Sequence, residues 1–305
     1  MEADRSETDL TPADGTARVR WFNRTVTERI GVLTDDYLAR SRPLGASRVL
    51  WEIGADGADL RSLRARLRLD SGYLSRLLRG LEAEGLVTVQ AGDGDRRVRA
   101  AVLTPAGRAE RAELDQRSDE HARSLLAPLT SRQQDQLIAA MGTVGRLLTA
   151  SLVEIDVLDP AAPAAQFCLR AYFSELETRF DGGFDTAAGL AGASGYAAPG
   201  GLMLVARLRE EPVGCGALRF VDGEPAQVKR MWVAPSARGL GLARRLLAEL
   251  EERARERGGA AVRLETNRVL TEAIALYRSC GYVEVPPFND EPYAHHWFEK
   301  QLPPG

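Results

Sequence analysis

The stretch "VAPSARGLGLARRLL", Val233–Leu247, decides the fold of the C-terminal half of this 305-residue chain. An apolar run ends there, a loop of Pro, Ser, Ala, Arg and Gly follows, and an amphipathic helix then begins. The first amides of a helix have no partner within it, and the helix dipole favours negative charge, so small residues at this point let an anion approach the backbone. The stretch predicts an anion-binding turn between a strand and a helix.

Two common phosphate-binding loops do not fit this turn. A Walker A loop needs Gly-Lys-Ser/Thr before its helix, and the turn contains no such sequence. A dinucleotide fingerprint needs a third glycine where this chain has Arg244. It also belongs to the first strand of a βαβ unit, whereas three strand candidates precede this turn, at 202–209, 212–221 and 226–234.

The sequence Arg238-x-x-Gly241-x-Ala243 resembles the R/Q-x-x-G-x-G/A motif of the GNAT superfamily of acyltransferases. The flanking "VKRMWVAPSARGLG" is similar to the family's fourth strand, and "LETNRVLTEAIALYRSCGYVE" to its fifth strand and the helix that follows. The resemblance covers about 160–303. It implies an α/β (α+β) GNAT fold with a mixed, mostly antiparallel sheet, and acetyl-CoA as cofactor. The cofactor-binding residues it implies are Met231, Trp232, Val233, Arg238, Gly239, Leu240, Gly241, Leu242, Ala243, Asn267 and Tyr277.

Acetyl transfer to an amine needs a proton acceptor, a site for the developing oxyanion and a proton donor for the departing thiolate. By the resemblance, backbone amides around 231–233 bind the acyl carbonyl and Tyr277 protonates the thiolate. Many relatives carry Glu early in the fourth strand, where this chain has Gln227, and an amide cannot accept the proton. Gln227 orients a water, or the base is elsewhere, with Glu265 on the next strand and Glu224 just upstream as candidates.

Four polar residues in and beside "NDEPYAHHWFEK" lie near the expected substrate end: Asp290, Glu291, His295 and His296. The two acids attract a cationic amine, and histidine titrates in the useful range. Adjacent residues of a strand point to opposite faces, so at most one of the histidines faces the site. These residues favour a primary amine of a small molecule or amino acid as the acceptor.

The N-terminal half has a different character. The whole chain has a net charge of −3, but between Arg61 and Arg111 eleven arginines stand against six acidic residues. Such a local excess of positive charge is typical of nucleic-acid binding. Helical periodicity extends to about residue 150, interrupted by "LVTVQAGDGDRRVRAAVLT", which predicts a hairpin around a Gly/Asp turn.

The stretch "LEAEGLVTVQAGDGDRRVRAAVLTPAGR" resembles the wing signature of MarR-type regulators, with Asp-Arg-Arg at 95–97 and Leu-Thr-x-x-Gly at 103–107. The resemblance covers about 18–150. It implies a mainly α winged helix-turn-helix that binds double-stranded DNA as a homodimer through its first and last helices. In the recognition helix "DSGYLSRLLRGLEAEG", an inward stripe is expected from Leu74, Leu77, Leu78 and Leu81. The DNA-binding candidates are Ser71, Tyr73, Ser75, Arg76, Arg79, Arg96 and Arg97.

We therefore expect two domains. Residues 1–17 are expected to form a disordered arm, 18–152 the MarR-like DNA-binding and dimerisation domain, 153–164 a Pro/Ala-rich linker and 165–305 the GNAT domain. Three widely spaced cysteines predict neither a disulfide framework nor a metal site. Without a signal sequence or an apolar run of about 20 residues, a cytoplasmic protein with no membrane partner is expected.

Three functions remain compatible with these motifs. The chain is a bifunctional regulator and N-acetyltransferase, or a regulator that senses acetyl-CoA without turnover, or a protein-lysine acetyltransferase that keeps the winged helix as a dimer scaffold. The departure at Gln227 keeps the sensor open, whereas Tyr277 and the intact glycine loop favour an enzyme. The Asp-Arg-Arg wing favours DNA binding.

Overall fold

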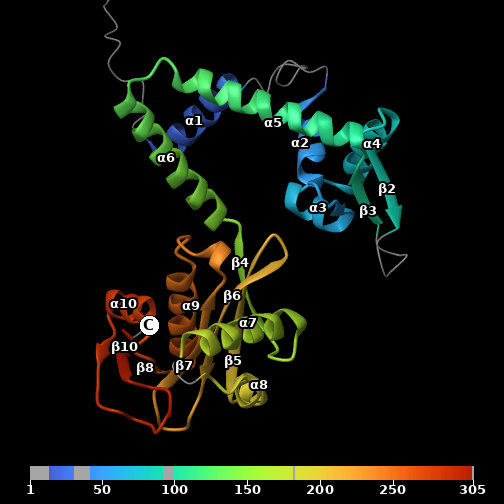
Figure 1. Ribbon diagram of the computed structural model, residues 1–305. Helices are drawn as coiled ribbons and strands as arrows, with labels where there is room; N and C mark the ends of the chain where they lie inside the picture. Colours follow the sequence, from blue (N-terminus) through green and yellow to red (C-terminus); the bar gives the residue numbers. More distant parts are fainter. Residues whose placement is uncertain (1–13, 31–41, 92–98, 181–182, 304–305) are drawn as a thin grey trace, which may run out of the picture. The chain divides into compact units, whose positions relative to one another are not determined.

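The structure is a computed structural model that describes residues 14–30, 42–91, 99–180 and 183–303 (Figure 1). The chain divides into two compact units, residues 1–135 and 136–305, and each has its own hydrophobic core. Within the described ranges, no helix has the length and apolar character needed to cross a bilayer. Arg96 and Arg97 of the predicted wing lie outside the described residues.

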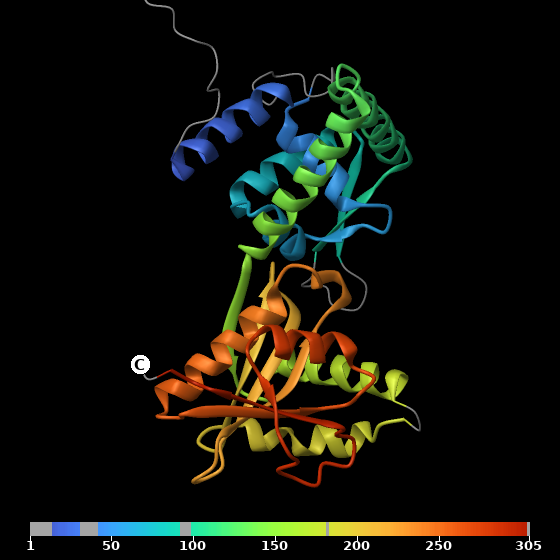
Figure 2. The same cartoon turned by 90° about the vertical axis from the view of Figure 1, so that its left-hand side faces the viewer.

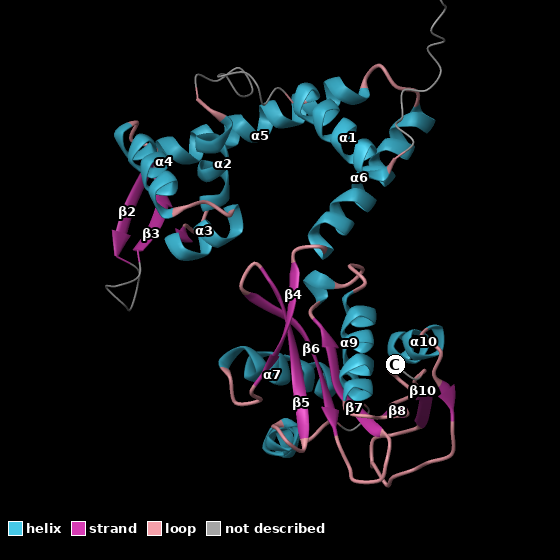
Figure 3. Ribbon diagram, turned by 180° about the vertical axis from the view of Figure 1, so that it is seen from behind, coloured by secondary structure: helices cyan, strands magenta, loops and turns pink. Residues whose placement is uncertain are grey.

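The N-terminal unit is mainly helical, and Figure 3 shows its strands β2 and β3 side by side. They belong to a small antiparallel sheet in the strand order β1-β3-β2. Its helices are α1 (Gly15–Arg29), α2 (Leu44–Ile53), α3 (Leu60–Leu67), α4 (Ser71–Ala83) and α5 (Pro105–Leu126). Its strands are β1 (Ala58–Asp59), β2 (Val87–Ala91) and β3 (Arg99–Leu103). A further helix, α6 (Ser131–Ala150), runs from this unit into the next. The predicted winged helix-turn-helix is confirmed.

Local sequence explains where the central helix of this unit begins and which face it buries. The Asp70 carboxylate accepts the Tyr73 amide at 2.8 Å and so caps α4. From there Leu74, Leu78 and Leu81 are buried at helical spacing, and Leu77 packs against the same core while partly exposed. The predicted inward stripe is therefore confirmed.

The Leu-Thr-x-x-Gly signature forms the joint between β3 and α5. The Thr104 hydroxyl donates to the Gly85 carbonyl at 2.7 Å and accepts the Gly107 amide at 3.0 Å, which caps the helix. A Cβ on Gly107 would lie 1.9 Å from the carbonyl oxygen of Leu86, so only glycine fits against that backbone. The signature is thus a packing requirement of this corner.

The C-terminal unit is built on a seven-stranded sheet in the order β4-β5-β6-β7-β8-β10-β9. The strands are β4 (Val153–Leu158), β5 (Gly201–Leu208), β6 (Glu211–Arg219), β7 (Ala226–Val233), β8 (Ala261–Thr266), β9 (Val283–Glu284) and β10 (His296–Gln301). The helices are α7 (Pro163–Arg179), α8 (Thr186–Ala191), α9 (Leu242–Glu256) and α10 (Thr271–Ser279), with short 3-10 turns at Gly192–Tyr196 and Pro235–Ala237. All pairings are antiparallel except that of β7 with β8, which confirms the predicted mixed sheet.

Helices cover both faces of this sheet (Figures 1 and 2). Side chains alternate along β5, so Met203 belongs to the core shared with α7. Its neighbour Leu204 belongs to the core shared with α9. This two-sided burial explains why the strands read as nearly continuous apolar runs in the sequence.

Two predicted boundaries are corrected. The expected linker 153–164 contains β4, whose residues from Val153 to Leu158 pair with β5 along their whole length. The alternation of apolar and acidic residues in 153–157 is a strand pattern that the neighbouring Pro/Ala-rich sequence obscured. The expected arm, 1–17, overlaps α1, which the Asp14 carboxylate caps by accepting the Ala17 amide at 2.9 Å.

The parallel pair β7 and β8 separates early. Only Ala226 and Gln227 pair with β8, through Val262 and Arg263, although both strands continue for several residues. β7 also loses register against β6 at a bulge where Arg230 has a φ of +57°. The strands therefore open a gap in the sheet, and the candidate site lies there.

Candidate functional site

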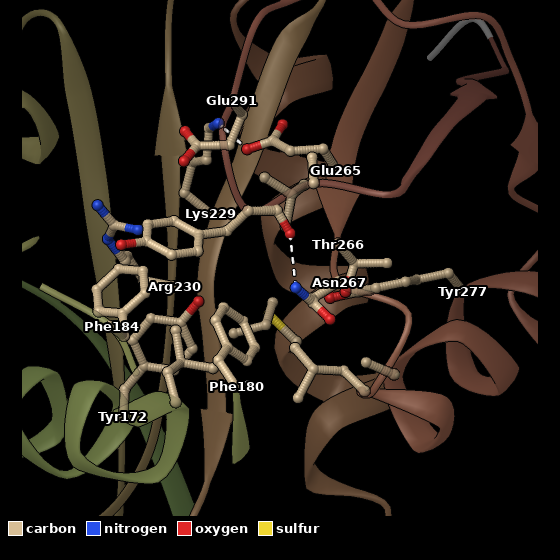
Figure 4. A pocket seen from close by; sticks show the side chains of 17 residues that line it. Tyr172, Phe180, Phe184, Lys229, Arg230, Glu265, Thr266, Asn267, Tyr277 and Glu291 are labelled. Atoms are coloured by element: carbon tan, nitrogen blue, oxygen red, sulfur yellow. Dashed lines mark hydrogen bonds and ion pairs between the residues drawn. The ribbon is translucent and has the colours of Figure 1, made fainter. Parts of the chain in front are cut away.

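Two adjoining cavities occupy this part of the C-terminal unit. The gap cavity lies between β7 and β8 and is lined by Val228–Met231, Glu265–Asn267, side chains of α7, and Glu291, Tyr293 and Ala294 (Figure 4). The loop cavity is lined by Met231–Val233, Arg238 and Ala243 together with parts of α7 and α10. Tyr172, Met231 and Tyr277 line both cavities.

The glycine loop has the geometry of an anion site. Gly239 and Gly241 have φ values of +79° and +74°, a conformation that side-chain-bearing residues adopt at a cost. Gly241 is the N-cap of α9 and supplies no side-chain cap. The first amides of α9 are therefore open to an external acceptor, at the positive end of the helix dipole.

Not every predicted cofactor residue lines the loop cavity. Met231, Trp232, Val233, Arg238, Ala243 and Tyr277 do. Leu242 is fully inside the core shared with α9, and Leu240 packs against that core. These two leucines could contribute only backbone amides. The pyrophosphate of acetyl-CoA fits the loop because its uncapped amides and glycine backbone suit an anion.

Arg238 is held by a carboxylate in this structure. Its guanidinium donates to both oxygens of Glu175 on α7, at 2.8 and 2.7 Å. The same carboxylate accepts the Trp232 indole N–H at 3.0 Å. Glu175 therefore occupies Nη2 of the arginine that the resemblance gives to the cofactor, and sequence reasoning did not single it out.

Tyr277 lies where a proton donor is expected. It is buried on α10 and contributes to the walls of both cavities. Burial, with smaller contributions from Tyr172 and Glu265, raises the pKa of its phenol above the ordinary value. The phenol thus remains protonated at neutral pH and can donate.

Of the candidates for the general base, only some line a cavity in the structure. Glu265 lines the gap cavity, with a side chain only 7% exposed that pairs with Lys229 and accepts from Asn289. Gln227 is buried and lines neither cavity, because β7 and β8 are still paired at its position. Glu224 pairs with Arg263 at 2.8 Å, also away from the cavity walls. Glu265 is the candidate that the geometry retains.

Asn267 has a structural role at the gap cavity. Its amide donates to the Tyr293 carbonyl at 2.8 Å, and its oxygen accepts the Val269 amide at 3.0 Å (Figure 4). It lines the gap cavity but not the loop cavity. Asn267 thereby fixes the segment that carries Tyr293 rather than facing the predicted cofactor loop.

Of the four predicted substrate residues, only Glu291 lines the gap cavity. Asp290 and His295 are exposed outside the cavity walls. His296 lies on β10, where its Nδ1 is 2.7 Å from a carboxylate oxygen of Glu284 on β9. His296, followed by Arg278, holds the pKa of Glu284 below its usual range. Neither histidine lines the gap cavity, which agrees with the expectation that at most one of them faces the site.

Sequence reasoning missed several residues of the gap cavity. Lys229 and Arg230 follow one another on β7, and both line the cavity because of the bulge. The aromatic wall consists of Tyr172, Phe180, Phe184 and Tyr293. The available signal was a pair of basic residues within an otherwise apolar strand.

In the N-terminal unit, α4 presents most of its predicted DNA-binding face to solvent. Ser71, Ser75, Arg76 and Arg79 are exposed. Tyr73 is partly buried, with its hydroxyl against Gly45 and the Arg76 guanidinium 5.6 Å from its ring centre. The exposed arginines could therefore reach a groove, whereas Tyr73 packs toward α2.

Comparisons with known proteins fit this division of the chain. Residues 169–282 match the acetyltransferase (GNAT) family, and residues 41–98 match the MarR family. GNAT acetyltransferases use acetyl-CoA as acyl donor. The two matched regions fall in different units of the structure.

Individual curated relatives match stretches of fewer than 100 residues of this chain. An IAA acetyltransferase of Azospirillum brasilense is 45% identical over 87 residues, which are 28% of this chain and 57% of that protein. An uncharacterised N-acetyltransferase of Escherichia coli (strain K12) is 36% identical over 93 residues, 30% of this chain and 56% of that protein. The chain thus spans little more than half of either relative. A GNAT-family acetyltransferase structure from Staphylococcus aureus Mu50 is 17% identical, covers 49% of this chain and 100% of that one, and has a TM-score of 0.42.

Proposed function

The chain joins a MarR-type domain to a GNAT acetyltransferase domain, and from this premise we propose that it is a bifunctional regulator and acetyl-CoA-dependent N-acetyltransferase. The acceptor we propose is a primary amine of a small molecule or amino acid. The observation that carries the enzymatic half is the meeting of two cavities at Tyr277, one beside the glycine loop and one beside Glu265.

In this proposal each side chain has a defined chemical task. The cofactor supplies an acetyl group activated as a thioester. The amides of the glycine loop and Arg238 bind its pyrophosphate, and the backbone around Met231–Val233 binds the acyl carbonyl. Glu265 takes one proton from the incoming ammonium, directly or through a water, so that the nitrogen can form the C–N bond while the C–S bond breaks. Tyr277 gives a proton to the departing sulfur and takes up the second proton that the nitrogen loses.

A sensor without turnover is the second candidate, favoured by the amide at position 227. Glu265 weakens that argument, because the gap cavity retains a carboxylate although Gln227 lies outside it. Thiol release from acetyl-CoA across a panel of small amines tests the two. Amine-dependent release supports the enzyme, and cofactor binding without release by any amine supports the sensor.

For the N-terminal unit we propose binding to operator DNA through α4 and the wing. The support is the exposure of Arg76 and Arg79 together on one helix. A salt titration of binding to the chain's own upstream DNA and to a random duplex tests it. A specific site keeps its affinity at physiological salt better than the random duplex does; equal loss for both contradicts the regulator.

Dimerisation through α1 and α6 is part of the same proposal. Neither helix buries any residue, and large apolar side chains are exposed on each. Examples are Val19 and Phe22 on α1 and Met141 and Leu148 on α6. Exposed apolar faces of this kind are common at subunit interfaces. The molar mass of the full chain in solution tests it, because a monomer at micromolar concentration contradicts it.

A further inference from the structure

We propose that the acceptor is an amine that also carries a carboxylate and an apolar side chain, as an apolar α-amino acid does, and that Arg230 binds the carboxylate. The proposal rests on the acetyl transfer proposed above and names the substrate class of the same site. It is carried by the charges and aromatic rings that line the gap cavity.

The bulge of β7 places Arg230 in the cavity wall (Figure 4). In a regular strand only alternate residues face one side, yet every residue from Val228 to Met231 lines this cavity. Arg230 has a φ of +57°, a conformation that a non-glycine residue adopts only at an energetic cost. Backbone strain of this kind tends to be retained where it positions a functional side chain.

The two cations of the cavity differ in their partners. The Lys229 ammonium pairs with Glu265, which lies on β8 opposite it. Across the described ranges no aspartate or glutamate pairs with the Arg230 guanidinium, and its Nε is buried without a hydrogen-bond partner. The guanidinium lies beside the Tyr172 phenol, 4.9 Å from the ring centre of Phe173 and 5.6 Å from that of Tyr196.

A guanidinium in this setting is suited to an anionic ligand. Its planar donors match a carboxylate in two-point contact, and partial burial among rings strengthens such a bond. A partly buried cation without a carboxylate partner is also unfavourable, so an arriving carboxylate compensates it. Arg230 therefore selects for a negative group on the acceptor.

The rest of the cavity defines what accompanies the carboxylate. Phe184 and Tyr293 pack with ring centres 4.7 Å apart, and Phe180 lies 5.7 Å from Tyr293, which forms an apolar wall. On the polar side the Glu291 carboxylate attracts an ammonium group, beside Glu265, whose charge is shared with Lys229. Amine, carboxylate and apolar body together describe a zwitterionic apolar amino acid. A protein lysine has no carboxylate beside its amine.

The test compares matched amines on the full-length chain. L-phenylalanine and L-leucine carry the carboxylate, and their amides and 2-phenylethylamine do not. We expect kcat/KM of acetylation to be about 10- to 100-fold higher for each acid than for its amide, the range of a charge-assisted hydrogen-bonded pair. Arg230→Gln should remove that preference mainly by raising KM for the acids, while the amides change less than about threefold.

Controls separate recognition from folding. Arg230→Lys keeps the charge and should recover part of the preference. Arg268→Gln removes an exposed cation that follows Asn267 but does not line the cavity, and it should leave the preference intact. The acetyl-CoA dissociation constant of each variant reports whether the fold and the loop cavity survive.

Three results overturn the proposal. Equal kcat/KM for acids and amides in the unmodified chain shows that no carboxylate is selected. A uniform loss for acids, amides and 2-phenylethylamine in Arg230→Gln and Arg230→Lys alike shows a structural role for Arg230. Absence of turnover with every amine removes the proposed function as well, whereas turnover without preference removes only this inference.

Discussion

Replacing Glu175 with Gln should tighten acetyl-CoA binding, whereas replacing Arg238 with Gln should weaken it. In the structure Nη2 of Arg238 donates to both carboxylate oxygens of Glu175, at 2.8 and 2.7 Å, so Glu175 competes with the cofactor for this nitrogen. The side chains of Arg238 and Glu175 are 48% and 25% exposed, so their ion pair is worth about 1 kcal/mol at most. Its loss should lower the dissociation constant by up to about fivefold.

The opposite change has a larger expected effect. Arg238→Gln removes a charge-assisted bond to phosphate, worth about 1.5–3 kcal/mol, and should raise the dissociation constant by about 10- to 150-fold. In an Arg238→Gln background, Glu175→Gln should lose most of its benefit. Glu177→Gln removes a carboxylate from the same helix outside both cavities, which controls for general electrostatics.

Isothermal titration of the full chain with acetyl-CoA measures all four variants directly. Weaker binding by Glu175→Gln, or an Arg238→Gln dissociation constant within about twofold of the unmodified chain, would refute the assignment of Arg238 to the pyrophosphate. A gain in Glu177→Gln as large as that in Glu175→Gln would show that the effect is only net charge.

Three further results are expected. Tyr277→Phe should lower kcat by about 100-fold or more without weakening acetyl-CoA binding, and full retention of kcat in this variant excludes Tyr277 as the acid. Because burial raises the pKa of Tyr277, this phenol should cause no alkaline loss of kcat below about pH 10 in steady-state profiles of the unmodified chain. Gly107→Ala should lower the free energy of unfolding of the N-terminal unit in urea by at least about 1–3 kcal/mol, because its Cβ would lie 1.9 Å from the Leu86 carbonyl oxygen. Gly80→Ala is the control and should not destabilise the unit, because no atom lies within 4 Å of the added Cβ. Equal stability of the two variants contradicts the packing argument. Arg76→Ala should weaken operator binding by about 1–3 kcal/mol in a fluorescence anisotropy titration, and Arg123→Ala on α5 should not; equal losses would place the contact elsewhere.

Local sequence predicted the parts of this chain that depend on local chemistry. The strand, glycine loop and helix around Gly241 follow from residues within one turn of one another. The leucine stripe of α4 also followed, because a helix fixes which residues share a face.

What the sequence could not predict depends on where strands pair and separate. Gln227 lies outside the cavities because β7 and β8 are still paired at its position. Arg230 lines the gap cavity because a bulge reverses its direction, and no local pattern specifies that bulge. Glu175 meets Arg238 from a helix 63 residues away, a contact set only by the packing of α7.

The most direct test of the account is the stoichiometry of the reaction. The full chain is mixed with acetyl-CoA and an accepted amine, and free thiol and acetylated amine are measured together over time. The account predicts one thiol released for each amine acetylated, with both rates strongly reduced in Tyr277→Phe. Tight acetyl-CoA binding with thiol release no faster than in the absence of the amine would contradict it.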